Sequence, residues 1–226
     1  MALQNYTNRT GTLTSSNATT VYTVPDGKTA IIQGGNIMNA SASTPTLDID
    51  FTNASDTDFK FVSDNAFTGG QFKSIIPRPC FLDEKEKIKL TASAANKFDY
   101  HFSFAEVDQG VNNKYINKMV DMDSTNKTTI YTVPDNRTAI ITQWAVCNYT
   151  DSNVGATNYW YHYNADGDEF ELAYGTIAAD SSVVAFIRSM ILQEKEAIKF
   201  QAQSADALNV FASILEMERA GGSASE

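Results

Sequence analysis

The sequence predicts an all-β protein made of two tandem antiparallel β-sandwich domains that arose by internal duplication. Residues 20–32 read TVYTVPDGKTAII and residues 129–141 read TIYTVPDNRTAII, so ten of the thirteen positions are identical. Elsewhere apolar and polar residues alternate with a period of two, which is typical of strands with one buried face. Many short strands between turn residues then favour sandwiches of the jelly-roll-like or immunoglobulin-like kind.

Each copy of the duplicated stretch reads as a strand, a turn and a strand. Pro25 and Pro134 fix φ at a value suited to the first central position of a turn. The informative difference is Gly27 against Asn136, because these two residue types adopt positive φ most readily. The stretch therefore predicts a type I turn closed by a left-handed residue, as in three-residue hairpin loops.

The duplication extends over most of the chain. Matched residues include Tyr6 with Tyr115, Asn8 with Asn117, Arg9 with Lys118, Ser103 with Ser213 and Glu106 with Glu216. A repeat unit of this length is a whole domain rather than a solenoid or propeller repeat. We therefore predict a first β-sandwich module at residues 1–110, a second at 111–217, and a flexible tail rich in Gly, Ser and Ala at 218–226.

Within each copy the closing segments have the clearest strand pattern. Apolar residues alternate with polar ones over 98–104, and the matching positions 208–214 carry Leu, Val, Ala and Ile. Residues 88–90 and 198–200 alternate apolar residues with lysine in the same way. Residues 82–87 have a helix-like composition, but the segment is short and lies between strands, so we predict a charged turn there.

Composition excludes several classes of function. The chain has 226 residues, 42% of them hydrophobic, and a formal net charge of −10 with a pI near 4.6. We predict no nucleic-acid binding, because such binding begins with neutralisation of phosphates by a basic patch. No apolar run approaches the ~18 residues that span a bilayer, and the first ten residues lack the apolar core of a secretory signal. The sequence therefore predicts no membrane contact and synthesis in a cytoplasm.

The chain contains two cysteines and two histidines as candidate functional residues. Cys80 aligns with Met190 and Cys147 with Met38, so we predict buried core thiols in different domains rather than a disulfide or a catalytic thiol. His101 and His162 have neither metal-ligand spacing nor a nucleophile partner, and we predict packed or surface histidines.

Acidic residues gave two further candidates. Residues 164–169 (NADGDE) resemble part of a calcium loop, but the required glutamate and flanking helices are missing, so a hairpin turn is favoured. Asp48 with Asp50 and Asp166 with Asp168 are spaced to share a strand face, with no cleft indicated between them. We therefore predict no catalytic, cofactor-binding or metal-binding residues, and a protein that is not an enzyme.

An aromatic run is the main feature unique to the second copy. It contains Tyr159, Trp160, Tyr161 and Tyr163. Alternation places the three tyrosines on one face of a strand and Trp160 on the other, so at least one face belongs to a core. Two interpretations remain for the other face: packing within the domain or against another subunit, or a platform on which a sugar ring stacks.

The two copies resemble a module of tailed-bacteriophage virion proteins. The resemblance rests on YTVPD(G/N)(K/R)TAII, a variable middle, LxxxExIK(L/F) and a closing strand that ends in Glu, and it covers most of residues 6–217. It implies a structural role in the virion, as a head-decoration (cement) protein that contacts the major capsid protein or other virion proteins, and it implies no catalytic residues. It also implies a homotrimer. The alternative is a tail-associated module that binds a carbohydrate or a receptor.

Overall fold

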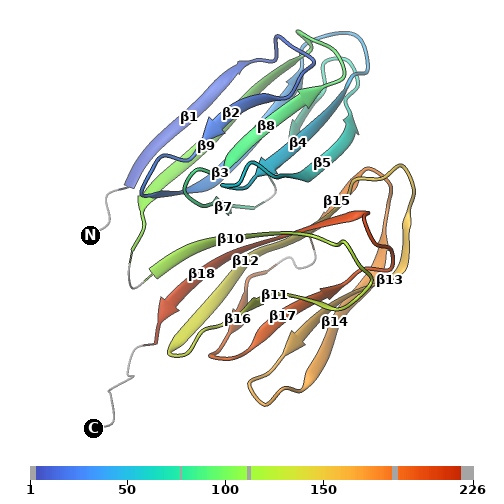
Figure 1. Ribbon diagram of the computed structural model, residues 1–226. Helices are drawn as coiled ribbons and strands as arrows, with labels where there is room; N and C mark the ends of the chain where they lie inside the picture. Colours follow the sequence, from blue (N-terminus) through green and yellow to red (C-terminus); the bar gives the residue numbers. More distant parts are fainter. Residues whose placement is uncertain (1–3, 77, 111–112, 185–187, 220–226) are drawn as a thin grey trace.

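The computed structural model describes residues 4–76, 78–110, 113–184 and 188–219. Every regular element in those ranges is a β-strand (Figure 1). The first half contains β1 (Gln4–Thr12), β2 (Thr19–Thr23), β3 (Lys28–Asn39), β4 (Thr46–Thr52), β5 (Asp58–Ala66), β6 (Phe72–Ser74), β7 (Cys80–Leu82), β8 (Lys87–Ala92) and β9 (Phe98–Asp108). The second half contains β10 (Asn113–Asp121), β11 (Thr128–Thr132), β12 (Arg137–Asn148), β13 (Val154–Tyr163), β14 (Glu169–Ile177), β15 (Ser181–Val184), β16 (Met190–Leu192), β17 (Ala197–Gln201) and β18 (Leu208–Glu218).

Each half forms a sandwich of two antiparallel sheets, so the all-β tandem β-sandwich prediction is confirmed. In the first half the orders are β1-β9-β3-β6, with β7 also paired to β3, and β2-β8-β4-β5. The second half repeats them as β10-β18-β12-β15, with β16 on β12, and β11-β17-β13-β14. Successive strands β1, β2 and β3 alternate between sheets, which is jelly-roll topology. The first two strands of an immunoglobulin sandwich instead lie together in one sheet.

The turn in the duplicated stretch has the predicted backbone but a different role. Gly27 has φ +70° and Asn136 has φ +58°, and Lys28 N donates to Pro25 O at 3.2 Å. The hairpin interpretation is wrong, because β2 pairs with β8 whereas β3 pairs with β9. The turn carries the chain across the sandwich from one sheet to the other, and a left-handed residue reverses the chain equally well there.

The tyrosine of the duplicated stretch ties the two sheets of each module together. Tyr22 Oη donates to Glu106 Oε1 at 2.9 Å, and Tyr131 Oη donates to Glu216 Oε2 at 2.7 Å. Burial and the neighbouring carboxylate raise the pKa of both phenols above their usual range. Both phenols therefore stay protonated as donors, which accounts for the matched tyrosine and glutamate in the two copies.

We expect Tyr131→Phe to lower the free energy of unfolding by about 2 kcal/mol, because a buried carboxylate loses a hydrogen-bond donor. Tyr22→Phe should cost a similar amount in the first module. Urea denaturation measures both changes. Tyr174→Phe is the matched control, since that side chain is 68% exposed. Equal stability of all three variants would contradict the proposed role of the Tyr–Glu pairs.

The two hydrophobic cores meet at the contact between the modules. The second core lies within its own sandwich. The first core also includes Ala145, Cys147 and Phe211 from the outer face of the second module's sheet. Both cysteines are free and buried, as predicted, and burial raises the pKa of the Cys147 thiol to about 11. Met38, which aligns with Cys147, is instead 43% exposed, because no second sandwich covers that face of the first module.

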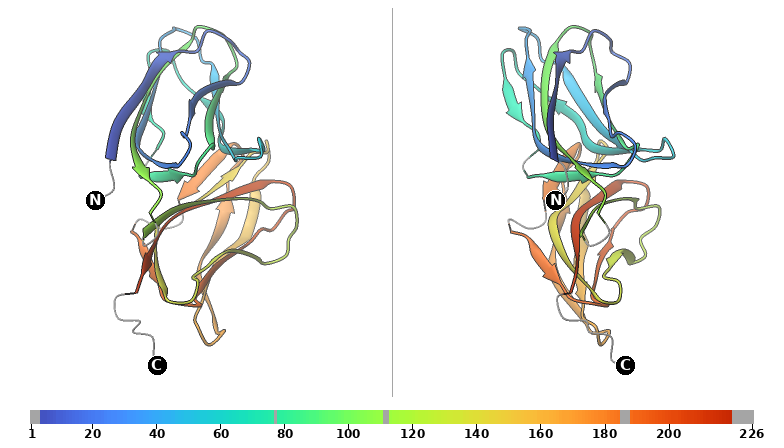
Figure 2. Two further views of the ribbon diagram at one scale, coloured as in Figure 1. Left: turned by 60° about the vertical axis from the view of Figure 1, so that its left-hand side comes forward. Right: turned by 90° about the vertical axis from the view of Figure 1, so that its left-hand side faces the viewer.

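The modules are stacked with the end of the first on the outer face of β10, β18 and β12 (Figures 1 and 2). The ring of Phe211 lies edge-on to Phe61, with centroids 5.3 Å apart, and to Phe51, at 5.8 Å. The ring of Phe81 on β7 lies edge-on to Tyr115 on β10, at 5.1 Å. The two sandwiches therefore share an apolar interface.

The proposed module boundary and the proposed tail lie partly outside the described segments. Residues 111–112, at the start of the second module, lie outside them. Strand β18 continues to Glu218, and Arg219 N donates to Asn136 O at 3.1 Å, so the first two residues assigned to the tail have defined structure. Residues 220–226 lie outside the described segments.

Candidate interaction surfaces

The aromatic run lies on β13, in the sheet β11-β17-β13-β14. Trp160 points into the second core, where its ring lies edge-on to Phe200 with centroids 5.0 Å apart, and it is only 4% exposed. Trp160 is therefore a packing residue that a ligand cannot reach. The predicted alternation holds, since the tyrosines point to the opposite, outer face.

A tyrosine face forms on the outside of this sheet, made of Tyr159, Tyr161, Tyr163 and Tyr174. Tyr174 comes from the edge strand β14 and lies beside Tyr159, with ring centroids 6.1 Å apart. The rings of Tyr159 and Tyr161 stack at 5.7 Å. Tyr161 is 8% exposed and Tyr174 is 68% exposed, so the edge-strand end of the face is the part open to solvent.

Two lysines cover part of the tyrosine face. Lys127 Nζ lies 3.7 Å from the ring centroid of Tyr161, and Lys199 Nζ lies 3.4 Å from that of Tyr163. Both contacts are cation–π interactions. Glu169 completes the cluster, because it pairs with Lys127 and accepts a hydrogen bond from Tyr163 Oη. The lysines therefore occupy the ring faces that a sugar would need at Tyr161 and Tyr163.

The corresponding face of the first module is charged. Ile49 lies opposite Leu90 in the first module, and Trp160 lies opposite Phe200 in the second. Ile49 is therefore the counterpart of Trp160, and the counterparts of the three tyrosines on β13 are Asp48, Asp50 and Thr52. Lys60 Nζ lies 2.6 Å from Asp48 and 3.5 Å from Asp50. Burial raises the pKa of Asp50 to about 6. The Asp48 and Asp50 pair thus belongs to an ion-pair cluster on the sheet surface.

The remaining candidates from the sequence have packing or turn roles. His101 Nδ1 lies 2.7 Å from Thr10 Oγ1, and His162 Nε2 lies 3.3 Å from Glu196 Oε2. The Asp166 and Asp168 pair lies in the β13–β14 hairpin turn, where Gly167 has φ +89°. In the part of the chain that the structure describes, no group of three or more His, Cys, Asp or Glu residues is placed to hold a metal ion.

A pair of carboxyl groups at the module interface could not be identified from the sequence. Glu86 Oε2 accepts hydrogen bonds from Asn117 Nδ2 at 2.9 Å and from Asp83 N at 2.8 Å. Burial raises the pKa of Glu86 to about 7 and that of Asp83 to about 6, although Lys118 lowers both. Glu86 belongs to the predicted charged turn, which is present, but its burial depends on the second module.

These carboxyl groups predict a stability that falls as the pH rises. Because the folded pKa values are raised, the folded state binds more protons than the unfolded state between about pH 4 and 7. Their contribution is complete below that window and is lost as the pH rises through it. We expect Glu86→Gln to stabilise the protein more at pH 8 than at pH 5. The change that it causes in the free energy of unfolding should be about 2 kcal/mol more favourable at pH 8. Urea denaturation at both pH values measures this.

The matched control is Glu84→Gln, two residues away in the same turn. Glu84 is only half-buried and lies 3.4 Å from Lys85, so loss of its charge should change stability little at either pH. If Glu86→Gln changed stability equally at pH 5 and pH 8, burial of that carboxyl group would not control the pH dependence.

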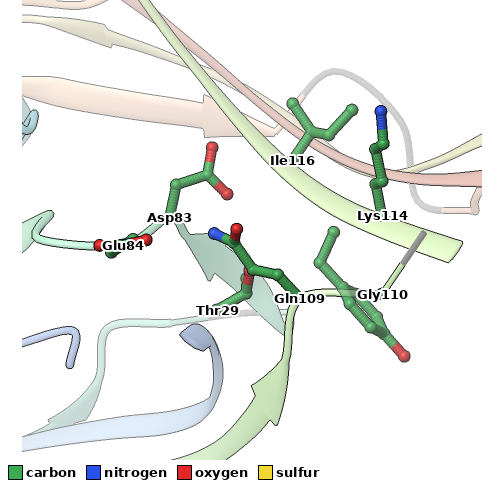
Figure 3. Close-up of a pocket in the computed structure, with 8 residues that line it drawn as sticks. Thr29, Asp83, Glu84, Gln109, Gly110, Lys114 and Ile116 are labelled. Carbon is green, nitrogen blue, oxygen red and sulfur yellow. The ribbon is translucent and has the colours of Figure 1, made fainter. Parts of the chain in front are cut away.

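A cleft of about 280 Å³ opens beside the linker, between the modules (Figure 3). It is lined by Thr29, Asp83, Glu84, Gln109, Gly110, Lys114, Tyr115 and Ile116. Asp83 and Gln109 project into it, whereas the Lys114 ammonium group points away from both acidic side chains. The volume is at the lower limit of ligand pockets, and the lining does not converge on a single ligand chemistry.

No protein-family model matches the sequence, and no curated protein matches it either. Among solved structures, the chain is similar to the STIV MCP, with 9% identity, a TM-score of 0.37, and coverage of 95% of this chain and 96% of that one. It is also similar to the major capsid protein P2 from bacteriophage PM2, with 10% identity, a TM-score of 0.31, and coverage of 98% of this chain and 100% of that one. A third similar structure is the CBM22-1-CBM22-2 tandem domain from Paenibacillus barcinonensis Xyn10C, with 9% identity, a TM-score of 0.27, and coverage of 96% of this chain and 91% of that one. The described residues also contain no helix long and apolar enough to cross a membrane.

Proposed function

We propose that the chain is a non-enzymatic structural protein of a tailed-bacteriophage virion, and specifically a decoration or cement protein of the capsid. The observation that carries the proposal is the amount of apolar side chain presented on the outside of two tightly joined modules. The exposed large hydrophobic residues of the described chain are Tyr6, Met38, Phe72, Phe170, Leu172, Tyr174 and Ile191. Met38 and Phe72 are cross-strand neighbours, and Phe170, Leu172 and Tyr174 lie together on β14. Exposed apolar residues that lie together support a protein-binding surface.

The proposed mechanism is the burial of surface against neighbouring capsid subunits. Each contact formed only by the assembled particle stabilises it by mass action. The partners would be the major capsid protein or other virion proteins, and the chain would be made in the bacterial cytoplasm before assembly. The net charge of −10 favours contact with protein over contact with packaged DNA. The resemblance in sequence further supports a homotrimer.

Purified particles of the phage that encodes the chain test this proposal. We expect mass spectrometry to detect the chain in the particles and electron microscopy to place it on the outer capsid surface. Particles from a phage lacking the gene should release their DNA at a lower temperature. Absence of the chain from purified virions would overturn the proposal, and single copies without threefold arrangement would overturn the trimer.

The exposure of Tyr174 beside Tyr159 favours a second candidate, a tail-associated module that binds a carbohydrate or a receptor. A glycan array with the wild-type chain, Tyr174→Ala and Tyr159→Ala tests it. The matched control is Tyr163→Ala, since Lys199 covers that ring. Saturable binding that is lost in the first two variants and kept in the control would favour this candidate over cement.

A further inference from the structure

The contact between the modules has a receiving face and an inserted end. On the receiving face of the second module, Ser213 Oγ accepts a hydrogen bond from Phe81 N at 3.0 Å, and Asn117 Nδ2 donates to Glu86 at 2.9 Å. Tyr115 packs against Phe81. These interactions fix how the end of the first module, which carries Phe81 and Glu86, sits on the outer sheet face of the second.

The first module has the same receiving face, and the described chain covers only one end of it, where Ala105 and Val107 are buried in a cluster that packs against Tyr115 and Leu215. Tyr6 opposes Ala105 as Tyr115 opposes Leu215, so the face can be matched residue by residue. Tyr6, Asn8, Ser103 and Asp99 stand at the positions of Tyr115, Asn117, Ser213 and Asn209. Three of the four residues are identical in the two modules, and Asp99 keeps the side-chain oxygen acceptor of Asn209.

The rest of this face is exposed to solvent. Tyr6 is 72% exposed, and Met38 is 43% exposed where its counterpart Cys147 is fully buried. Phe72 opposes Met38 as Ser182 opposes Cys147, and Phe72 is 60% exposed. The first module therefore exposes three large apolar side chains on the face whose counterpart in the second module is buried against the first.

The second module has the matching inserted end, also uncovered. Ile191 opposes Ile140 as Phe81 opposes Ile31, and Ile191 is 62% exposed whereas Phe81 is 4% exposed. Leu172 is the extra residue of a β-bulge in β14, at the place where Phe61 is the extra residue in β5. Leu172 is 38% exposed.

The polar part of the inserted end is also repeated. Gln193 N donates to Glu196 Oε2 at 2.8 Å, just as Asp83 N donates to Glu86 Oε2 at 2.8 Å. Glu196 is therefore held in the same orientation as Glu86, which accepts a hydrogen bond from Asn117.

We propose that copies of this chain associate head to tail, with the second-module end of one copy seated on the first-module face of the next. Ile191 and Glu196 would meet Tyr6, Asn8 and Ser103 of the neighbour in the geometry of the contact between the modules. This association does not depend on a place in a virion. A contact between two different surfaces of identical chains forms a closed ring or an open filament, according to whether the rotation closes.

The intermolecular contact is weaker than the one within the chain. Ile191 and Leu172 are smaller than Phe81 and Phe61, and His101 replaces Phe211. The contact within the chain also benefits from the effective concentration that the linker provides. Association between copies therefore depends on protein concentration, and its partners are other copies of the same chain.

Sedimentation velocity over a concentration series tests the proposal with two variants of the full chain. Ile191→Asp alters the inserted end and Met38→Asp alters the receiving face, and both positions are exposed in the single chain. We expect the wild-type chain to assemble, and each variant alone to bind at least about tenfold more weakly. An equimolar mixture should form a 1:1 dimer and nothing larger, because only one intact end and one intact face remain.

Ser204→Asp in the exposed β17–β18 loop is the control for added charge, and it should assemble as the wild type does. Circular dichroism checks that all variants are folded. A wild-type chain that stays monomeric up to its solubility limit would overturn the proposal. So would assembly that neither variant weakens, or a mixture of the two variants that shows no dimer.

Discussion

We expect Phe211→Ala to lower the free energy of unfolding by about 3–5 kcal/mol, because its ring packs edge-on against the stacked rings of Phe51 and Phe61 at the end of the first core. Its loss leaves a cavity at the joint between the modules. We therefore also expect the single unfolding transition to separate into two. Differential scanning calorimetry measures both effects.

His101→Ala is the matched control, because His101 occupies the corresponding position in the first module, where no further sandwich covers it. We expect a small change in stability and one transition. The same experiment bears on the proposed division into modules at residues 1–110 and 111–217. If Phe211→Ala unfolded in one step with unchanged stability, neither the shared core nor the coupling between the modules could be as described.

Trp160→Ala is expected to destabilise the second module by about 3–5 kcal/mol, since its side chain is 4% exposed and packs against Phe200. Fluorescence-monitored urea denaturation measures the loss. Tyr174→Ala is the control on the outer face of the same sheet, and it should change stability by no more than about 0.5 kcal/mol. A Trp160→Ala chain as stable as the wild type would show that the tryptophan is not a core residue.

Local patterns were sufficient to predict the strands and the positive φ at Gly27 and Asn136, because both depend on neighbouring residues. The same patterns gave the wrong partners for β2 and β3. A left-handed residue reverses the chain direction, but which strand pairs with which is decided by packing between sheets. That information is spread over segments far apart in the sequence.

The candidate surface was predictable to the same extent. Alternation separated Trp160 from the three tyrosines, since it needs only the period of a strand. The contribution of Lys127 and Tyr174 depends on strands that pair over long distances in the chain. Met38 and Cys147 illustrate the other limit, because aligned residues in two copies differ in burial when only one copy is covered by a neighbour.

The order in which the chain is synthesised gives the shared core a further consequence. Phe61 and Phe81 are covered by the second module, which leaves the ribosome later. At 5–20 residues per second, the roughly 110 residues of that module take about 5–20 s to make. During this interval the first module exposes an apolar end that the second module does not yet cover. Release of a chain truncated after the first module should therefore give an aggregation-prone product, whereas an isolated second module would expose a smaller apolar surface around Phe211.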